Sequence, residues 1–399
     1  MLRKLFDELE EIYPELVDIR RDLHMYPELS HQEVNTPRKI AEYLEKLGLE
    51  VRTEVGGRGV VGTLKGGKPG KTVALRADFD ALPIQEETDV EYKSRVPGVM
   101  HACGHDLHTA TLLGVAKVLS GVRDEIPGTI KFIHQFAEEA TPGGAKAMVA
   151  DGCLDGVDMI YGAHVMSTEE FGTVSVKEGY ASSAQDDFNI VIHGRGGHGS
   201  QPHLSVDPLV TGSQLVVNLQ QIVSRRVDPL QAAAVTVGSF VSGEVNNVIP
   251  DSAVIKGTVR TFDEEARTII AEALENVTNA TCTANGATVD FEYIKDCPSI
   301  YNDPQETKRV EEMATLLVGK ENLITGVPMM GSEDFAFYQK EVPGVYFLVG
   351  GRNEEIGAVF PHHHPKFTID ERAILHIGNM FISLVFNFLS DGKIKPESK

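Results

Sequence analysis

The sequence predicts an α/β protein in which a small α+β domain is inserted into a larger catalytic one. Two apolar segments, "TVALRADF" and "GTIKFIHQF", are typical of buried strands, and helical patterns separate them from weaker strands in "DMIYGAHV" and "GVYFLVGG". Strands that alternate with helices favour a mostly parallel sheet with helices on both faces. Near residue 185 a different order of strands and helices begins.

The spacing of apolar residues predicts three helices in the larger domain. "LHTATLLGVAKVL" has a helical period, and Asp106 just before it is expected to cap the first turn. "GGAKAMVADG" predicts a shorter helix. "DERAILHIGNMFISLVFNFL" predicts a long amphipathic helix near the end of the chain.

The inserted segment, residues 185–295, predicts the order β-α-β-β-α-β. Its strands are "DDFNIVIHG", "QAAAVTVGSFV", "SAVIKGTVRTF" and "ATVDFEYI", and its helices are "DPLVTGSQLVVNLQQIVSRR" and "DEEARTIIAEALENVTNATCTAN". This order is the ferredoxin-like split motif, a complete small fold. We therefore expect 185–295 to form its own domain and 1–184 and 296–399 to form one discontinuous domain. A free sheet edge in the insert favours a dimer.

Composition excludes several classes of protein. The chain has 399 residues, 42% of them hydrophobic, which is enough for a large core. Its formal net charge is −21 and it has no basic run, so nucleic-acid binding is not expected. It lacks an apolar run of membrane-spanning length and a signal-like start, which predicts a cytoplasmic protein without a membrane partner. Of its four cysteines, three are expected to be buried thiols: Cys153, Cys282 and Cys297.

The fourth cysteine lies in "MHACGHDLH", which concentrates metal-ligating residue types. Cys103 and His105 are two residues apart, so in a turning segment both side chains can reach one ion. The alternative is a polar loop at a helix start that contains a free cysteine. His101 and His108 are expected to have supporting roles.

Further titratable residues follow the predicted strands. Glu138 and Glu139 come just after "IHQF", where one carboxylate can bind a metal and the other can accept a proton. The alternative is a solvated acidic turn. His164 follows another strand, and "PHHHPKF" contains three adjacent histidines, of which at most two can face one ion. The combination predicts a metal centre.

Seven motifs occur along the chain in the order "LRADFDALP", "MHACGHDLHTA", "HQFAEE", "GAH", "GRGGHGSQPH", "MGSEDFAFY" and "HHHPKF". In this combination they resemble the amidohydrolase subgroup of the metallo-aminoacylase and carboxypeptidase-G superfamily, which includes hippurate hydrolases, N-acetyl-diaminopimelate deacetylases and auxin-conjugate hydrolases. The resemblance spans nearly the whole chain. One departure is Asp78, which stands where the wider superfamily has a histidine ligand, and in this subgroup a cysteine replaces that ligand.

The resemblance implies a centre of two divalent ions, for which Mn, Zn, Co and Ni remain open. The residues at ligand positions are Cys103, His105, Glu139, His164 and His363. His105 occupies the bridging position, and His362 and His364 compete with His363. Glu138 is at the position of the general acid/base. Asp80 is at the position of a catalytic-site aspartate that orients a ligand.

For the insert, the resemblance implies a lid and dimerisation domain. His198 is at the position that holds the substrate carbonyl oxygen, and Asn247 and Arg260 are at positions that bind a substrate carboxylate. The expected substrate is a small N-acyl-L-amino acid, and the expected assembly is a homodimer or homotetramer. Two alternatives stay open: a dipeptidase or exopeptidase on the same scaffold, and a non-enzymatic metal-binding protein.

Overall fold

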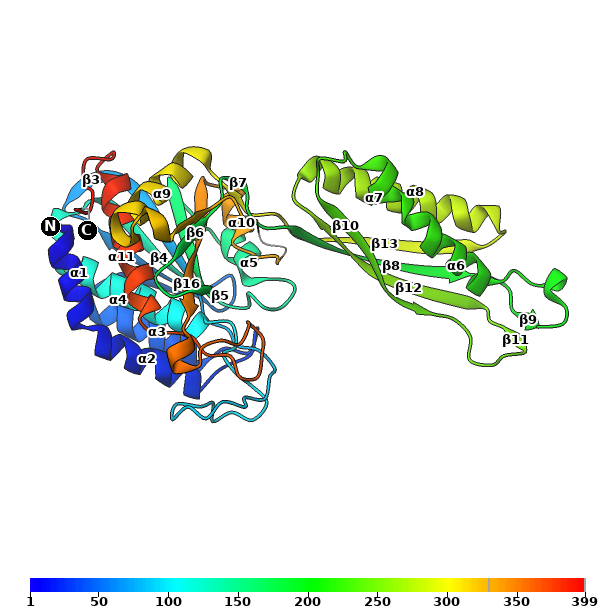
Figure 1. Ribbon diagram of the computed structural model, residues 1–399, viewed down its shortest axis with the longest axis horizontal. Coiled ribbons are helices and arrows are strands. Elements are labelled where there is room, and N and C mark those ends of the chain that lie inside the picture. The colour runs from blue at the N-terminus through cyan, green and yellow to red at the C-terminus, as the bar shows by residue number, and fades with distance from the viewer. Residues whose placement is uncertain (329–330, 398–399) are drawn as a thin grey trace. The chain divides into compact units, whose positions relative to one another are not determined.

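The chain forms two compact units in the computed structural model, which describes residues 1–328 and 331–397. The first unit combines Met1–Gly179 with Tyr301–Val327 and the described chain from Asp334 onward, so it is discontinuous. The second unit consists mainly of Tyr180–Ile300, which contains the segment 185–295. Figure 1 labels the helices and most of the strands of both units.

A mixed eight-stranded sheet forms the centre of the first unit, with the order β1-β2-β4-β3-β5-β16-β6-β15. The central strands β4, β3, β5 and β16 run parallel to one another, whereas β1 pairs antiparallel with β2, β2 with β4 and β16 with β6. The strands are β1 (Glu50–Val55), β2 (Gly59–Lys65), β3 (Lys68–Asp78), β4 (Pro127–Gln135), β5 (Met159–Glu170), β6 (Val174–Val176), β15 (Leu323–Thr325) and β16 (Gly344–Arg352).

Helices cover both faces of this sheet. The second half of β3 and almost all of β16 are buried, which requires cover on both sides of each strand. The helices are α1 (Leu2–Glu11), α2 (Tyr13–Met25), α3 (Asn35–Lys46), α4 (His105–Gly121), α5 (Gly144–Ala150), α9 (Pro304–Val318), α10 (Ala336–Gln339) and α11 (Ala373–Leu389). Mostly parallel strands with helices on both faces agree with the fold class expected from the sequence.

The start of α4 differs from the sequence prediction. Gly104, with φ of 104°, is the N-cap residue, so the helix begins at His105 and Asp106 lies inside the first turn. Among the described residues no side chain caps this helix; instead the Asp106 carboxylate forms an ion pair with Arg20 Nε at 2.8 Å and accepts a hydrogen bond from His24 Nδ1 at 2.8 Å. The expected cap was therefore wrong, because a buried guanidinium is a stronger partner for a buried carboxylate than backbone N–H groups are.

The second unit contains a four-stranded antiparallel sheet with the order β10-β12-β8-β13. Its main elements follow the β-α-β-β-α-β order, except that the first expected helix is two consecutive helices. They are β8 (Ala184–His193), α6 (Pro208–Leu219), α7 (Gln221–Arg226), β10 (Ala233–Val241), β12 (Ser252–Thr261), α8 (Glu264–Ala284) and β13 (Thr288–Cys297). Figure 1 shows the three helices on one face of the sheet, where the core of this unit lies. The short strands are β7 (Gly179–Tyr180), β9 (Gly197–His198), β11 (Val248–Ile249) and β14 (Tyr301–Asn302).

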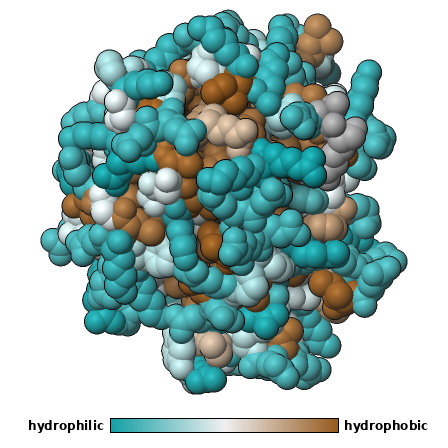
Figure 2. All heavy atoms as spheres, turned by 90° about the vertical axis from the view of Figure 1, so that its left-hand side faces the viewer, coloured by the Kyte–Doolittle hydropathy of each residue, from teal (hydrophilic) through white to brown (hydrophobic). Residues whose placement is uncertain are grey.

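Surface and core distribution agree with the composition. Figure 2 shows mostly hydrophilic residues over one face of the molecule, with hydrophobic residues scattered among them. Among the described residues, no helix combines the length and the apolar character that crossing a membrane requires. Cys153, Cys282 and Cys297 are free and buried, which confirms the expectation for these three thiols.

Candidate metal centre and active site

The predicted ligands of the first unit come from the ends of neighbouring elements. β3 ends at Asp78, β4 ends at Gln135, and α4 begins at His105, two residues after Cys103. His164 lies within β5, which pairs in parallel with β3. Because parallel strands end at one edge of a sheet, these side chains gather there.

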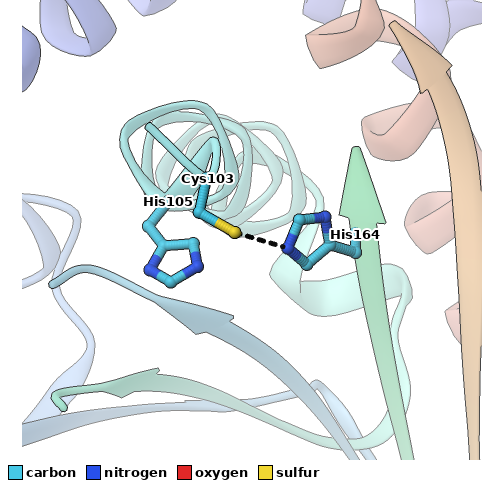
Figure 3. A group of neighbouring side chains, drawn as sticks. All are labelled: Cys103, His105 and His164. Atoms are coloured by element: carbon cyan, nitrogen blue, oxygen red, sulfur yellow. Dashed lines mark hydrogen bonds between the residues drawn. The ribbon is translucent and has the colours of Figure 1, made fainter. Parts of the chain in front are cut away.

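Cys103, His105 and His164 form the first group of side chains (Figure 3). Their ligating atoms lie within 4.8 Å of one another, and Cys103 Sγ is 3.3 Å from His164 Nε2. His164 Nδ1 donates to the Val165 carbonyl at 2.7 Å, which leaves Nε2 as the ring's electron-pair donor. His105 Nδ1 lies 3.0 Å from the Asp80 carbonyl oxygen and 3.1 Å from Asp80 Oδ1. His105 therefore also presents Nε2 to a ligand.

A second group joins Cys103 with Glu139 and His363. His363 Nε2 is 3.2 Å from Glu139 Oε1. His363 has φ of 62°, and its N–H donates to the Ala102 carbonyl at 2.8 Å, so a left-handed turn brings this ring to the cluster. Glu138 and Glu139 also form a group with His105.

The neighbouring histidines have other partners. His362 Nε2 accepts a hydrogen bond from Ser167 N at 3.1 Å. His364 Nδ1 accepts one from Lys366 N at 3.0 Å, and its ring stacks on Phe360. Of the three adjacent histidines, His363 is the one that the structure places in a group of candidate ligands.

Two observations indicate that cations fit these groups. His105 Nε2 and Glu139 Oε1 are buried, and neither has a hydrogen-bond partner among the described residues. Buried polar atoms without a partner are costly, and a divalent ion would satisfy both. The combination of sulfur, nitrogen and oxygen donors suits Zn, Mn, Co or Ni.

The pKa shifts agree with a site that holds opposite charges close together. Burial opposes the charging of His105, but Asp78, Asp80 and Glu139 together raise its pKa to about 10. Burial, with the Glu139 and Glu138 carboxylates nearby, raises the pKa of Cys103 well above its usual value. Bound cations would favour deprotonated ligands and so oppose both shifts.

Asp78 and His108 lie next to the candidate ligands. Their atoms also form a group with His105. However, Asp78 accepts from Arg76 Nη1 at 2.6 Å and from His108 Nδ1 at 2.7 Å, and His108 Nε2 accepts from Val165 N at 3.0 Å. Both side chains thus already have protein partners, and sequence patterns gave no signal for the role of Arg76.

Asp334, in the motif "MGSEDFAFY", joins the same support. It accepts from Arg76 Nη2 at 3.0 Å, from Gln135 Nε2 at 2.7 Å and from Ala145 N at 3.1 Å. This buried network ties the ends of β3 and β4 to the start of α5. Met330 of the same motif lies outside the described residues.

Asp80 connects several parts of the site. Its Oδ1 contacts His105 Nδ1, and its Oδ2 accepts from Ser30 Oγ at 2.7 Å and from Glu139 N at 3.0 Å. Hydrogen bonds to the imidazole and to the Glu139 backbone suit a residue that orients ligands. The contribution of Ser30 was not expected from the sequence.

The remaining predicted residues belong to the second unit. His198 is exposed in β9, which pairs with β11, and Gly199 N donates to the Asn247 carbonyl at 2.9 Å. Arg260 lies near the end of β12, opposite Gln185 in the register, and its Nη1 is buried without a hydrogen-bond partner among the described residues. Asn247 comes shortly before the start of β12 at Ser252. Asn247 and Arg260 therefore lie at opposite ends of this strand.

Nitrogen, oxygen and sulfur donors at one edge of an α/β sheet are typical of metal-dependent hydrolytic enzymes. The chain belongs to the peptidase family M20/M25/M40, whose signature matches residues 74–386. This confirms the resemblance drawn from the seven motifs. The protein is thus a hydrolase of this family. Membership of the family disfavours the alternative of a non-enzymatic metal-binding protein.

Three similar proteins illustrate the range of the family. Thermostable carboxypeptidase 1 of Saccharolobus solfataricus is 41% identical over 96% of this chain and 98% of that protein. N-acetylcysteine deacetylase of Bacillus subtilis is 41% identical over 92% of this chain and 95% of that protein. A Bacillus subtilis structure described as a dinuclear metal-binding peptidase of the M20 family has a TM-score of 0.82 and 36% identity, covering 96% and 99% of the two chains.

Proposed function

We propose that this protein is a metal-dependent amidohydrolase that cleaves N-acyl-L-amino acids to a carboxylate and a free amino acid. The observation that supports this most strongly is the pair Glu138 and Glu139, whose carboxylates lie with His105 in one ligand group. A structural metal site is closed by its ligands and needs no additional carboxylate. A catalytic site needs a ligand and a separate base, and these two residues supply both.

The proposed centre holds two divalent ions through Cys103, His105, Glu139, His164 and His363. Cys103 lies in the group with His164 and also in the group with His363, so its sulfur can be shared between two ions. His105 offers only Nε2, because its Nδ1 faces Asp80. We therefore assign the bridging role to Cys103 rather than to His105. When bound, the ions would supply an activated water and polarise the acyl carbonyl.

Glu138 carries out the proton transfers in this proposal. It accepts the proton of the attacking water and later donates it to the nitrogen of the leaving amine, which departs only when protonated. Asp80 keeps His105 in the tautomer that presents Nε2. Arg260 binds the substrate carboxylate, with which a guanidinium forms a charged and potentially bidentate pair.

The second unit acts as lid and dimerisation unit in this proposal. His198 and Asn247 lie at the Ser252 end of β12, and Arg260 is the eighth residue after Ser252, about 25–30 Å away along an extended strand. One small substrate cannot contact both ends of one copy. We therefore assign the contact with the substrate carbonyl to His198 of the partner subunit in a homodimer, and the contact of Asn247 with the substrate carboxylate to the same partner subunit.

The test is amino-acid release from N-acetyl and N-benzoyl amino acids. The protein is first stripped of metal and then given Mn, Co, Zn or Ni in turn. We expect one of these metals to restore hydrolysis with two ions bound per chain. Two bound ions without hydrolysis of any acyl amino acid would contradict the proposal.

An exopeptidase is the second candidate, because a carboxypeptidase is as similar to the chain as the deacetylase is. Dipeptides and N-acyl dipeptides tested beside the acyl amino acids separate the two. Preference for a free α-amine would identify a dipeptidase. Preference for an N-acyl group on a single amino acid would identify an aminoacylase.

A further inference from the structure

The segment from Glu28 to Glu33 borders the candidate site, although none of its residues has a role in the proposed reaction. Leu29 forms an isolated β-bridge with Ala81, and Ala81 N donates to the Glu28 carbonyl at 2.9 Å. The segment is therefore fixed to the chain that follows β3. From this position it reaches two parts of the site.

The first contact is with Asp80. Ser30 Oγ donates to Asp80 Oδ2 at 2.7 Å, and the same oxygen accepts from Glu139 N at 3.0 Å. Asp80 thus holds the backbone of the ligand Glu139 through a hydrogen bond that does not involve Glu33.

The second contact is with the turn that precedes Glu138. Ala137 is fully buried and has φ of 48°, a left-handed conformation that costs a residue with a side chain about 1 kcal/mol or more. Its N–H donates to Glu33 Oε1 at 2.9 Å. Such a conformation persists only where its surroundings enforce it, and the Glu33 carboxyl group supplies a specific partner for it.

Glu33 is itself fully buried, which is unusual for a carboxyl group. Its Oε2 has no hydrogen-bond partner among the described residues, and Arg58 Nε is 3.9 Å from this oxygen. Burial, opposed by backbone hydrogen bonds and aided by Asp80, raises the pKa of Glu33 to about 7. Such a group is neutral in mildly acidic solution and still offers one oxygen to Ala137.

We propose that Glu33 is a positioning residue, which holds Ala137 in the left-handed turn that aims the Glu138 carboxylate at the reacting atoms. This rests on the proposed function, in which Glu138 transfers protons. Glu139 keeps its own anchor through Asp80, so the proposal predicts that loss of Glu33 impairs Glu138 without releasing a metal. A displacement of a reacting group by about 1 Å is enough to lower a rate about 100-fold.

The experiment compares Glu33→Met, which removes the acceptor, with Glu33→Gln, which keeps an acceptor oxygen in a neutral group. We expect Glu33→Met to lower kcat about 100-fold with KM within about twofold, and Glu33→Gln to stay within about threefold of wild type. Both variants should bind two ions per chain. The substrate is the N-acetyl-L-amino acid that the wild type hydrolyses fastest, and the metal is the one that restores its activity.

Glu306→Met is the matched control for lost stability. Glu306 is also buried and accepts from Tyr161 OH at 2.7 Å and from Arg309 Nε at 2.6 Å, but within the described chain no hydrogen bond or ion pair joins it to a candidate ligand. We expect this variant to lower the melting temperature while kcat stays at the wild-type value. Unchanged kcat in Glu33→Met, an equal loss in Glu33→Gln, or loss of an ion from Glu33→Met would each overturn the positioning role.

Crystal structures of the wild type and of Glu33→Met provide a readout that does not depend on activity. We expect Ala137 to leave the left-handed region in the variant. A retained positive φ would overturn the proposal. If the wild type hydrolyses no acyl amino acid, the proposed function fails, and the conformation of Ala137 still decides the role of Glu33.

Discussion

Within the run from His362 to His364, three identical side chains have three different partners. Ser167 N binds His362, Glu139 lies beside His363, and Lys366 N binds His364. Two of these partners are far away in the sequence, so local spacing could not assign the rings. The choice of His363 from the sequence rested on the resemblance alone, and its geometry now supports that choice.

His363→Ala should therefore reduce the metal content from two ions per chain to about one, because a candidate ligand of one ion is lost. His364→Ala is the matched control, and it should keep two ions. Elemental analysis after dialysis in the restoring metal measures both. The assignment fails if His364→Ala loses an ion while His363→Ala keeps both.

Glu138→Gln should bind two ions and lose about 10²- to 10⁴-fold in kcat, the range expected when a general acid/base is removed. Gln has the same shape and can neither accept nor release the proton. Steady-state kinetics on the same acyl amino acid, with metal analysis of the same sample, measure this. Wild-type turnover in this variant would assign the proton transfers elsewhere.

Glu33 also predicts a dependence of stability on pH in the metal-free protein. Its folded-state pKa of about 7 is raised above the usual value of 4.5, so the folded protein retains a proton that the unfolded chain releases. The stability from this group is complete below pH 4.5 and is lost as pH rises through 7. The free energy of unfolding of Glu33→Gln, relative to that of the wild type, should therefore be higher at pH 8 than at pH 5 by on the order of 2–3 kcal/mol. Urea unfolding at both pH values measures this, and an equal effect at both would refute the shift.

At the scale of elements, burial alone did not decide what the sequence could predict, since β2 is buried and was not expected. The expected strands in β3, β4, β5 and β16 are apolar and were assigned correctly. β1, with the sequence EVRTEV, is largely exposed, and β6 and β15 have three residues each, so none of these had a recognisable pattern. The start of α4 was misassigned because the partner of Asp106 is Arg20 in another helix, and no local motif reveals such a contact.

The ion pair between Asp106 and Arg20 predicts how much the protein loses in stability when Asp106 is replaced. Asp106 and Arg20 are both fully buried, and removal of one leaves an uncompensated charge. Asp106→Ala should destabilise the protein by about 3–5 kcal/mol, measured by urea unfolding. Glu50→Ala, which breaks the exposed pair with Lys65, is the control and should cost less than about 1 kcal/mol. Similar losses in the two variants would mean that burial does not set the strength of the Asp106 pair.

At the scale of the whole molecule, the sequence predicted an insertion at 185–295, and the second compact unit contains this segment. The different order of strands and helices could be recognised because the insert has its own alternating strands and its own core. The site could be predicted only as a set of residue types at strand ends. The tautomers, the proposed sharing of the Cys103 sulfur and the contacts of Glu33 and Arg76 depend on segments that are distant in the sequence, which no single stretch of sequence contains.

The length of β12 has a consequence for how activity depends on protein concentration. If Arg260 at one end and His198 at the other serve different sites, each site needs two polypeptides, and dilution below the dissociation constant should abolish turnover in proportion to the loss of dimers. Two inactive variants, His198→Ala and Glu138→Gln, should then complement each other. Subunit exchange between equal amounts should restore about a quarter of the wild-type activity, since half the dimers are hybrids with one intact site. No recovery after confirmed exchange would place both groups in one chain's site.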